Sequence, residues 1–374
     1  MKVVLACVLS LTLLTGCGGR SWLPYAREMG DTALVRTLGL DDAGGLVELT
    51  VSTGDGSGGE EALVLSAQGP SIPSAALGVQ SLGDSYVYYG HADQLVLGEQ
   101  WAMGGVSDLL DYLAREAELG LGVQLWVVRG GAAGEAIRAA GTRGASERLA
   151  QLNTDSQLGA ANINRTAAQL MAVLARQGST YLPALNLTPA RAGDGEEGAE
   201  KVLRPGGYAI LRQGRLVCWA EGDAARGVEL MEEQVFGQVV DLTVSDGTKV
   251  SLTLTGADTA CRPVFRSGEL VGLDVMCRVT ARVAQTPRKL TQDELMQLQQ
   301  KLEWMLGERV VQVLELAQHW DADYLWLERR VQMARPDQKT AIQEQWQQAF
   351  RALDIRVEVQ GKVERSLGMM DGAR

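Results

Sequence analysis

The most apolar stretch of the chain lies at its start and limits what the remainder can be. Met1-Lys2 gives a positive end, Val3 to Leu14 is interrupted by only two hydroxyl residues, and Thr15-Gly16-Cys17 follows. A positive start, a short apolar run and small residues before a cleavage site are typical of a secretory signal. A run of about 12 residues is too short for a lasting anchor, since a spanning helix needs roughly 20. We therefore predict that residues 1–16 form a signal peptide.

Cys17 is the predicted lipidation site. Thr15 and Gly16 are the small residues that a lipoprotein peptidase needs before its cysteine, and no Ala-x-Ala site competes nearby. The alternative is an ordinary signal peptide with a chance cysteine at its cleavage site. A diacylglycerol on Cys17 would supply two acyl chains, which is what stable anchoring takes. Residues 17–33 would then be a lipidated tether, and the rest of the chain would hang from one lipid because no later stretch stays apolar over about 18 residues.

Length and charge restrict the partners. A chain of 374 residues is too long for one hydrophobic core and predicts two or three domains of ~100–200 residues. The net charge of −11 repels nucleic acid and anionic lipid headgroups. We therefore expect no nucleic-acid partner, and we expect membrane attachment to come from the lipid or from protein partners.

The clearest domain boundary is the acidic, glycine-rich run from Gly193 to Gly198, which follows Pro183 and Pro189. Turn-forming residues, high charge and no apolar periodicity are typical of a connecting segment. The expected parts after the tether are an N-terminal α/β domain at 34–190, an acidic-glycine linker at 191–205, and a C-terminal α+β domain at 206–374 that could divide into 206–245 and 246–374.

Strand-like and helix-like runs alternate in the first half, which predicts mixed layers of helices and strands. The expected strands are 35–40, 46–53, 62–67, 86–97 with a break at Gly90, and 121–128. The expected helices are 72–82, 106–117, 132–139 and 158–177.

The second half has a different pattern. Asp246-Gly247 predicts a hairpin between strands at 239–244 and 249–255. Residues 270–283 alternate in polarity as a half-buried antiparallel strand does. Thr291 and Glu294 form a capping box, and an apolar stripe follows it at helical spacing: Leu295, Leu298, Leu302, Leu306, Val310 and Val313. Further short strands are expected at 208–211 and 216–220, further helices at 324–333 and 341–353, and a closing strand at 355–363. The predicted class is multi-domain α+β, with a C-terminal antiparallel sheet packed by long helices.

Three cysteines follow Cys17. Cys261 and Cys277 lie on either side of a predicted hairpin turn near Ser267-Gly268, and Cys218 lies apart. The two could face each other as a disulfide, but a register slip of one residue would separate them. Three separate buried thiols are the alternative.

No catalytic, cofactor or metal site assembles from the sequence. Gly54 to Gly59 satisfies G-x-G-x-x-G, but two glutamates and a strand follow it instead of a phosphate-binding helix. Gly83-Asp84-Ser85 resembles an esterase nucleophile block, yet the chain holds only two histidines, His91 and His319, and no Asp-x-x-His near its C-terminus. Two distant histidines without a C-x-x-C or H-E-x-x-H motif do not predict zinc. We expect a protein that is not an enzyme.

Several blocks in order resemble the spore germination receptor C-subunit lipoproteins, the GerAC-like or Ger(x)C family. In the first half these are Arg27-Glu28, Ala33 to Val35, Leu38 to Asp41, Leu46 to Val51, Ser66 to Gly69, Tyr89 to His91 and Leu95 to Glu99. In the second half they are Ala209 to Trp219, Arg226-Gly227, Asp321 to Tyr324, Trp346, Phe350 and Ile355 to Val363.

The resemblance implies a function that the residues alone do not. Such a protein is a membrane-anchored, non-catalytic subunit of a spore germinant receptor, required for nutrient-triggered germination and built of three mixed α/β domains. Its partners would be two integral membrane subunits, one permease-like, and it would lie on the outer face of the spore inner membrane. The resemblance does not assign nutrient binding to this subunit. An extracytoplasmic solute-binding lipoprotein of a transporter is the alternative, although the two halves of the sequence are unlike.

Overall fold

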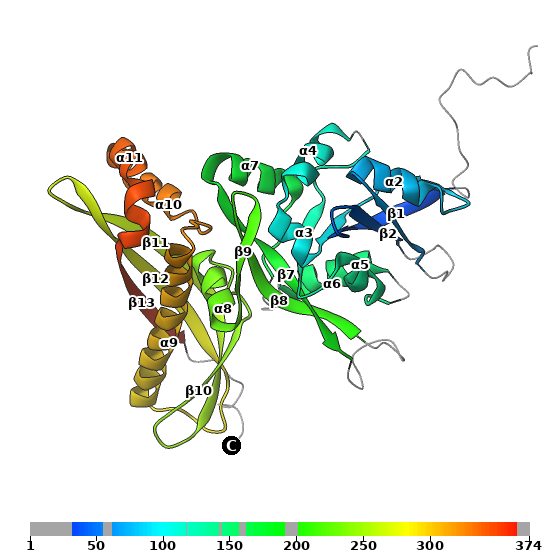
Figure 1. Cartoon of the computed structure of the whole chain (residues 1–374). Helices are drawn as coiled ribbons and strands as arrows, with labels where there is room; N and C mark the ends of the chain where they lie inside the picture. Colours follow the sequence, from blue (N-terminus) through cyan, green and yellow to red (C-terminus); the bar gives the residue numbers. More distant parts are fainter. Residues whose placement is uncertain are drawn as a thin grey trace, which may run out of the picture.

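The computed structural model describes residues 32–54, 62–116, 118–141, 144–156, 162–190 and 201–364. Two unlike halves follow each other along this part of the chain (Figure 1), and they contain a nine-stranded and a four-stranded sheet. No helix within these ranges is long and apolar enough to cross a membrane. The α+β class predicted from the sequence is confirmed.

The first sheet is parallel at its centre and antiparallel at both ends. Its order is β3-β2-β1-β5-β6-β7-β8-β9, and β4 also pairs with β1. The strands are β1 (Thr32–Asp42), β2 (Val47–Thr53), β3 (Val64–Gly69), β4 (Tyr86–Tyr88), β5 (Gln94–Leu97), β6 (Gln124–Arg129), β7 (Ser179–Pro189), β8 (Lys201–Arg212) and β9 (Arg215–Ala220). The pairs β1–β5, β5–β6 and β6–β7 are parallel.

Helices cover both faces of this sheet. Successive side chains of a strand point to opposite faces, so Leu95 and Leu97 join one core while Val96 joins the other. The first core is closed by α2 (Ile72–Gln80), α3 (Glu99–Gly104), α4 (Ser107–Arg115) and α7 (Ala167–Gln177). The second is closed by α5 (Ala133–Arg138) and α6 (Ala145–Ser156). Because β5 contributes to both cores, its four residues are all buried.

The predicted linker at 191–205 overlaps the start of a strand. Residues 201–205 belong to β8, which pairs antiparallel with β7 over most of its length. Pro183 lies within β7, and Pro189 is the last residue of this strand. A β-bulge follows Pro183, and a bulge is one of the few places where a strand tolerates proline. The remaining linker residues, 191–200, lie outside the described part of the chain.

The second half is a four-stranded sheet covered by helices. Its strands are β10 (Val239–Thr243), β11 (Lys249–Arg266), β12 (Glu269–Gln285) and β13 (Asp354–Glu364), in that order. The helices and turns are α8 (Gly222–Met231), α9 (Gln292–His319), α10 (Leu327–Ala334), η3 (Pro336–Gln338), α11 (Lys339–Ala349) and η4 (Phe350–Ala352). The sheet is antiparallel except for β13, which pairs parallel with β12 and so differs from the all-antiparallel prediction.

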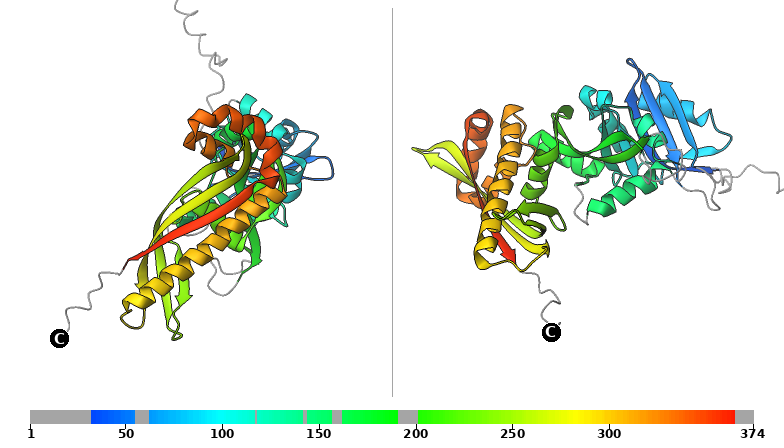
Figure 2. Two further views of the ribbon diagram at one scale, coloured as in Figure 1. Left: turned by 90° about the vertical axis from the view of Figure 1, so that its left-hand side faces the viewer. Right: turned by 90° about the horizontal axis from the view of Figure 1, so that it is seen from below.

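The long helix α9 packs on this sheet as its sequence predicts. All six residues of the predicted apolar stripe are buried. The capping box forms: the Thr291 hydroxyl accepts from the Glu294 backbone N–H at 3.3 Å, and the Glu294 carboxylate accepts from the Thr291 N–H at 2.8 Å. Figure 2 shows α9 running along the sheet beside β13.

Strand β8 joins the two halves. Its side chains alternate between faces, so Ala209 and Leu211 belong to the core of the first half. Tyr208 and Ile210 point the other way and belong to the core that α8, α9 and the second sheet enclose. All four side chains are fully buried. The two sheets are therefore connected by shared apolar packing as well as by the chain.

Candidate functional site

The predicted lipidation site, Cys17, lies outside the described residues, as do residues 1–31 in full. It stays a prediction of the sequence. Of the glycine-rich run Gly54 to Gly59, only Gly54 is described.

The histidines and Ser85 do not form a catalytic arrangement in the described residues. His91 is exposed, and its ring meets Tyr88 edge-on at 5.7 Å between centroids. Ser85 lies before β4, where its backbone carbonyl accepts from the Gln80 side chain. His319 ends α9 and packs against Trp320. Within the ranges the structure describes, no three metal-ligating side chains come together.

The cysteines of the hairpin are free thiols in the structure. The turn lies at Ser267-Gly268 as predicted, between β11 and β12. The register pairs Cys277 with Thr259 and Cys261 with Val275, so the two cysteines are diagonal neighbours and not opposite each other. Burial raises the pKa of Cys261 to about 12 and also raises that of Cys277. Both therefore behave as buried apolar side chains.

The family-like blocks of the first half meet at the start of α5. Asp41, at the end of β1, accepts from the backbone N–H of Ala133 at 2.7 Å and of Gly134 at 2.9 Å. A Cβ on Gly98 would lie 1.9 Å from Asp41 Oδ1, so any other residue at this position would displace the carboxylate that binds the start of α5. Burial raises the pKa of Asp41. These blocks therefore position a helix on the sheet.

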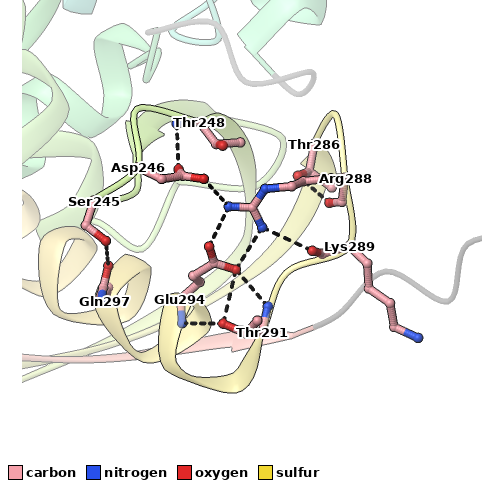
Figure 3. Close-up of polar contacts among 9 residues, drawn as sticks. All are labelled: Ser245, Asp246, Thr248, Thr286, Arg288, Lys289, Thr291, Glu294 and Gln297. Carbon is pink, nitrogen blue, oxygen red and sulfur yellow. Dashed lines mark hydrogen bonds and ion pairs between the residues drawn. The ribbon is translucent and has the colours of Figure 1, made fainter.

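An exposed polar network fastens the start of α9 (Figure 3). Arg288 forms ion pairs with Asp246 in the β10–β11 turn and with Glu294 of the capping box. The Arg288 contact is the main cause of the low pKa of Glu294, about 2. The Thr248 backbone N–H, with Arg288, lowers the pKa of Asp246 to about 2. Because both carboxylates are already paired with Arg288, this network has a structural role: it attaches the start of α9 to the β10–β11 turn.

The most unusual polar cluster is buried where the two halves meet. The Arg165 guanidinium, 8% exposed, lies between two aromatic rings, with its carbon 4.3 Å from the Tyr181 centroid and 4.4 Å from the Trp326 centroid. Desolvated cation–π contacts of this kind contribute about 2 kcal/mol. Arg165 and Tyr181 belong to the first half and Trp326 to the second, so the contact holds the halves together.

Glu232 supplies the negative charge of this junction. Its carboxylate lies 3.8 Å from Arg165 and 3.0 Å from Arg330. One carboxylate thus serves an arginine from each half. Trp326, the residue just before α10, has a left-handed backbone with φ of 57°. Its strained conformation is consistent with a ring held in place by Arg165.

A fully buried carboxylate, Glu229 of α8, lies one helical turn before Glu232. Glu229, 1% exposed, accepts from the Tyr208 hydroxyl at 3.1 Å and from the Gln238 amide at 2.6 Å. Arg226 pairs with it at 2.8 Å. Burial raises the pKa of Glu229, and these partners oppose that change. Tyr208 comes from β8, so this contact also joins the halves.

The described structure is thus an α+β protein whose two unlike halves share a core and a buried ionic junction. Residues 25–187 match the family model for the "Spore germination protein N-terminal domain". Residues 206–367 match the model for "Spore germination B3/ GerAC like, C-terminal". The chain therefore belongs to the GerAC-like family of spore germination proteins, as its sequence blocks indicated.

The fold agrees with this assignment. The chain is similar to the crystal structure of the GerBC protein, with a TM-score of 0.58 and 18% sequence identity, over 92% of this chain and 99% of that one. No curated protein matches the sequence significantly. The family is that of C subunits of multi-subunit, membrane-associated germinant receptors.

Proposed function

We propose that this chain is a lipid-anchored, non-catalytic subunit of a spore germinant receptor. The observation that carries the proposal is that both family domains match in order, over residues 25–187 and 206–367. The lipobox-like Thr15-Gly16-Cys17 supports the anchor. The subunit would lie on the outer face of the spore inner membrane and work with two integral membrane subunits, one of them permease-like.

Cys17→Ala tests the anchor, and Cys7→Ala is its matched control because it makes the same change within the apolar run. We expect Cys17→Ala to release the protein from the membrane fraction and to abolish nutrient-triggered germination. Cys7→Ala should change neither result. Normal germination with Cys17→Ala would contradict the proposed role of the anchor.

Partner identification tests the receptor role separately. Native membranes would be crosslinked, the complex purified through this chain, and the partners identified. Recovery of a permease-like subunit together with a second polytopic subunit supports the proposal. Recovery of a transporter ATPase with its permease would instead support a solute-binding role.

A further inference from the structure

Residues of α7, α10, η3 and α11 line an open groove between the two halves. Figure 1 shows where α7, α10 and α11 lie in the two halves. The C-terminal end of α7 forms one wall through Arg176 and Gln177. The other wall belongs to the second half and includes Arg329, Met333 and Lys339. Anything bound in this groove would contact both halves at once.

Three cations surround this groove. Arg176, Arg329 and Lys339 are exposed, and none of them forms an ion pair or a side-chain hydrogen bond with the residues that the structure describes. Nearby Arg335, in contrast, is paired with Asp337 at 2.9 Å. In a chain with a net charge of −11, unpaired cations gathered at one groove form a local positive field.

Among the residues that the structure describes, only one carboxylate lines the groove, that of Glu328. It is half-buried and accepts from the Gln332 amide at 2.8 Å. The N-terminus of α11, which contributes Lys339, has neither an acidic residue in its first turn nor a side-chain cap. The positive end of its dipole therefore adds to the field of the cations.

The groove also offers apolar and amide contacts. Met333 is 69% exposed and lies with Pro336 on the same wall. The amides of Gln177 and Gln343 line opposite walls and can pair with peptide groups. The cations come from three separate elements, α7, α10 and α11. Charges spread over three elements suit a chain of carboxylates better than a single small anion.

We propose that this groove binds an extended acidic peptide segment of another protein, with its carboxylates paired to Arg176, Arg329 and Lys339. The acidic net charge of the chain opposes a nucleic acid, whereas a short peptide with a few carboxylates adds little repulsion. This proposal does not depend on the lipid anchor or on the receptor role, and each of them can fail separately.

Fluorescence anisotropy with the purified full chain tests the proposal. The probe is a labelled peptide of alternating glutamate and glycine with one leucine, and glutamine replaces glutamate in the comparison peptide. The variant is Arg329→Glu with Lys339→Glu. Its control is Arg351→Glu with Lys249→Glu, which changes the net charge equally at exposed cations outside the groove.

We expect salt-dependent binding of the acidic peptide, about tenfold or more weaker for the glutamine peptide and for the groove variant. The control should change affinity by less than about twofold, since these cations lie away from the groove. Three results would overturn the proposal. They are an equal loss of affinity in the groove variant and the control variant, equal affinity for the two peptides, and no binding of the acidic peptide. If free glutamate displaces the labelled peptide as effectively as unlabelled peptide does at the same carboxylate concentration, the groove is a small-anion site and not a peptide site. Tighter binding of a single-stranded oligonucleotide would replace it with a nucleic-acid site.

Discussion

Gly227 lies where α8 crosses α9, and replacing it with alanine tests how closely these helices pack. A Cβ at this position would lie 2.2 Å from the Arg309 carbonyl oxygen and 3.1 Å from the Val313 Cβ. The first neighbour is backbone, so the helices must separate. Gly307 is the matched control, because its Cβ would meet only the Val359 side chain at 3.8 Å, an ordinary contact.

Gly227→Ala has two expected effects on stability, overpacking and a gain in helix propensity, and they have opposite signs. Overpacking costs roughly 1–3 kcal/mol, and the upper end applies when backbone is displaced. Alanine regains about 1 kcal/mol of helix propensity over glycine. Gly227→Ala should therefore lower the free energy of unfolding by about 2 kcal/mol net, which corresponds to a Tm lower by roughly 4–8 °C. Gly307→Ala keeps only the propensity gain and should be neutral or stabilising by up to about 1 kcal/mol.

Urea unfolding followed by circular dichroism measures both variants against the parent chain. Equal stability of Gly227→Ala and Gly307→Ala would refute the reasoning, because it would mean that α8 and α9 do not approach at this glycine. A destabilised Gly307→Ala would also contradict it.

Three further predictions concern titration, capping and thiol burial. Burial raises the pKa of Asp323 from 3.8 to about 6. Between these two pH values the Asp323 carboxyl is therefore protonated in the folded state and ionised in the unfolded state. The free energy of unfolding should fall by about 3 kcal/mol from this group as the pH rises through this window. The urea midpoint of Asp323→Asn should depend less on pH in this window than that of the parent chain. Thr291→Ala removes the α9 cap and should cost about 1 kcal/mol in urea unfolding. Cys261 and Cys277 should react with iodoacetamide at pH 8 only once denaturant is added, and rapid labelling of the native chain would contradict their burial.

Local patterns in the sequence predicted much of the second half. The capping box at Thr291 and Glu294 and the Asp246-Gly247 turn are local signals, and both form as expected. In the first half, the turn formers before the predicted linker are part of a strand. Pro183 is a turn former in its local sequence, and the bulge that follows it in the β7–β8 pair accommodates it within β7. The helix expected at 158–177 begins at Ala167, while α6 was not predicted.

The buried junction could not be predicted in this way. Arg165, Glu232 and Trp326 come from segments far apart in the chain, and no local spacing relates them. A single arginine in a polar stretch is most often a solvated residue. Its burial depends on the meeting of the two halves, which is a tertiary property. The family blocks, in contrast, were visible because they follow each other in order along the chain.

The two-sided burial of β8 has a consequence for how such proteins could be recombined. The sequence regions that match the two family models end at 187 and begin at 206, which suggests two interchangeable modules. A chimera cut between these points would take β8 from one parent and β7 from the other. The foreign strand would have to complement two interiors at once, through Tyr208 and Ile210 on one side and Ala209 and Leu211 on the other. The halves are therefore constrained to change together, and a workable exchange would have to carry β7 to β9 as a block.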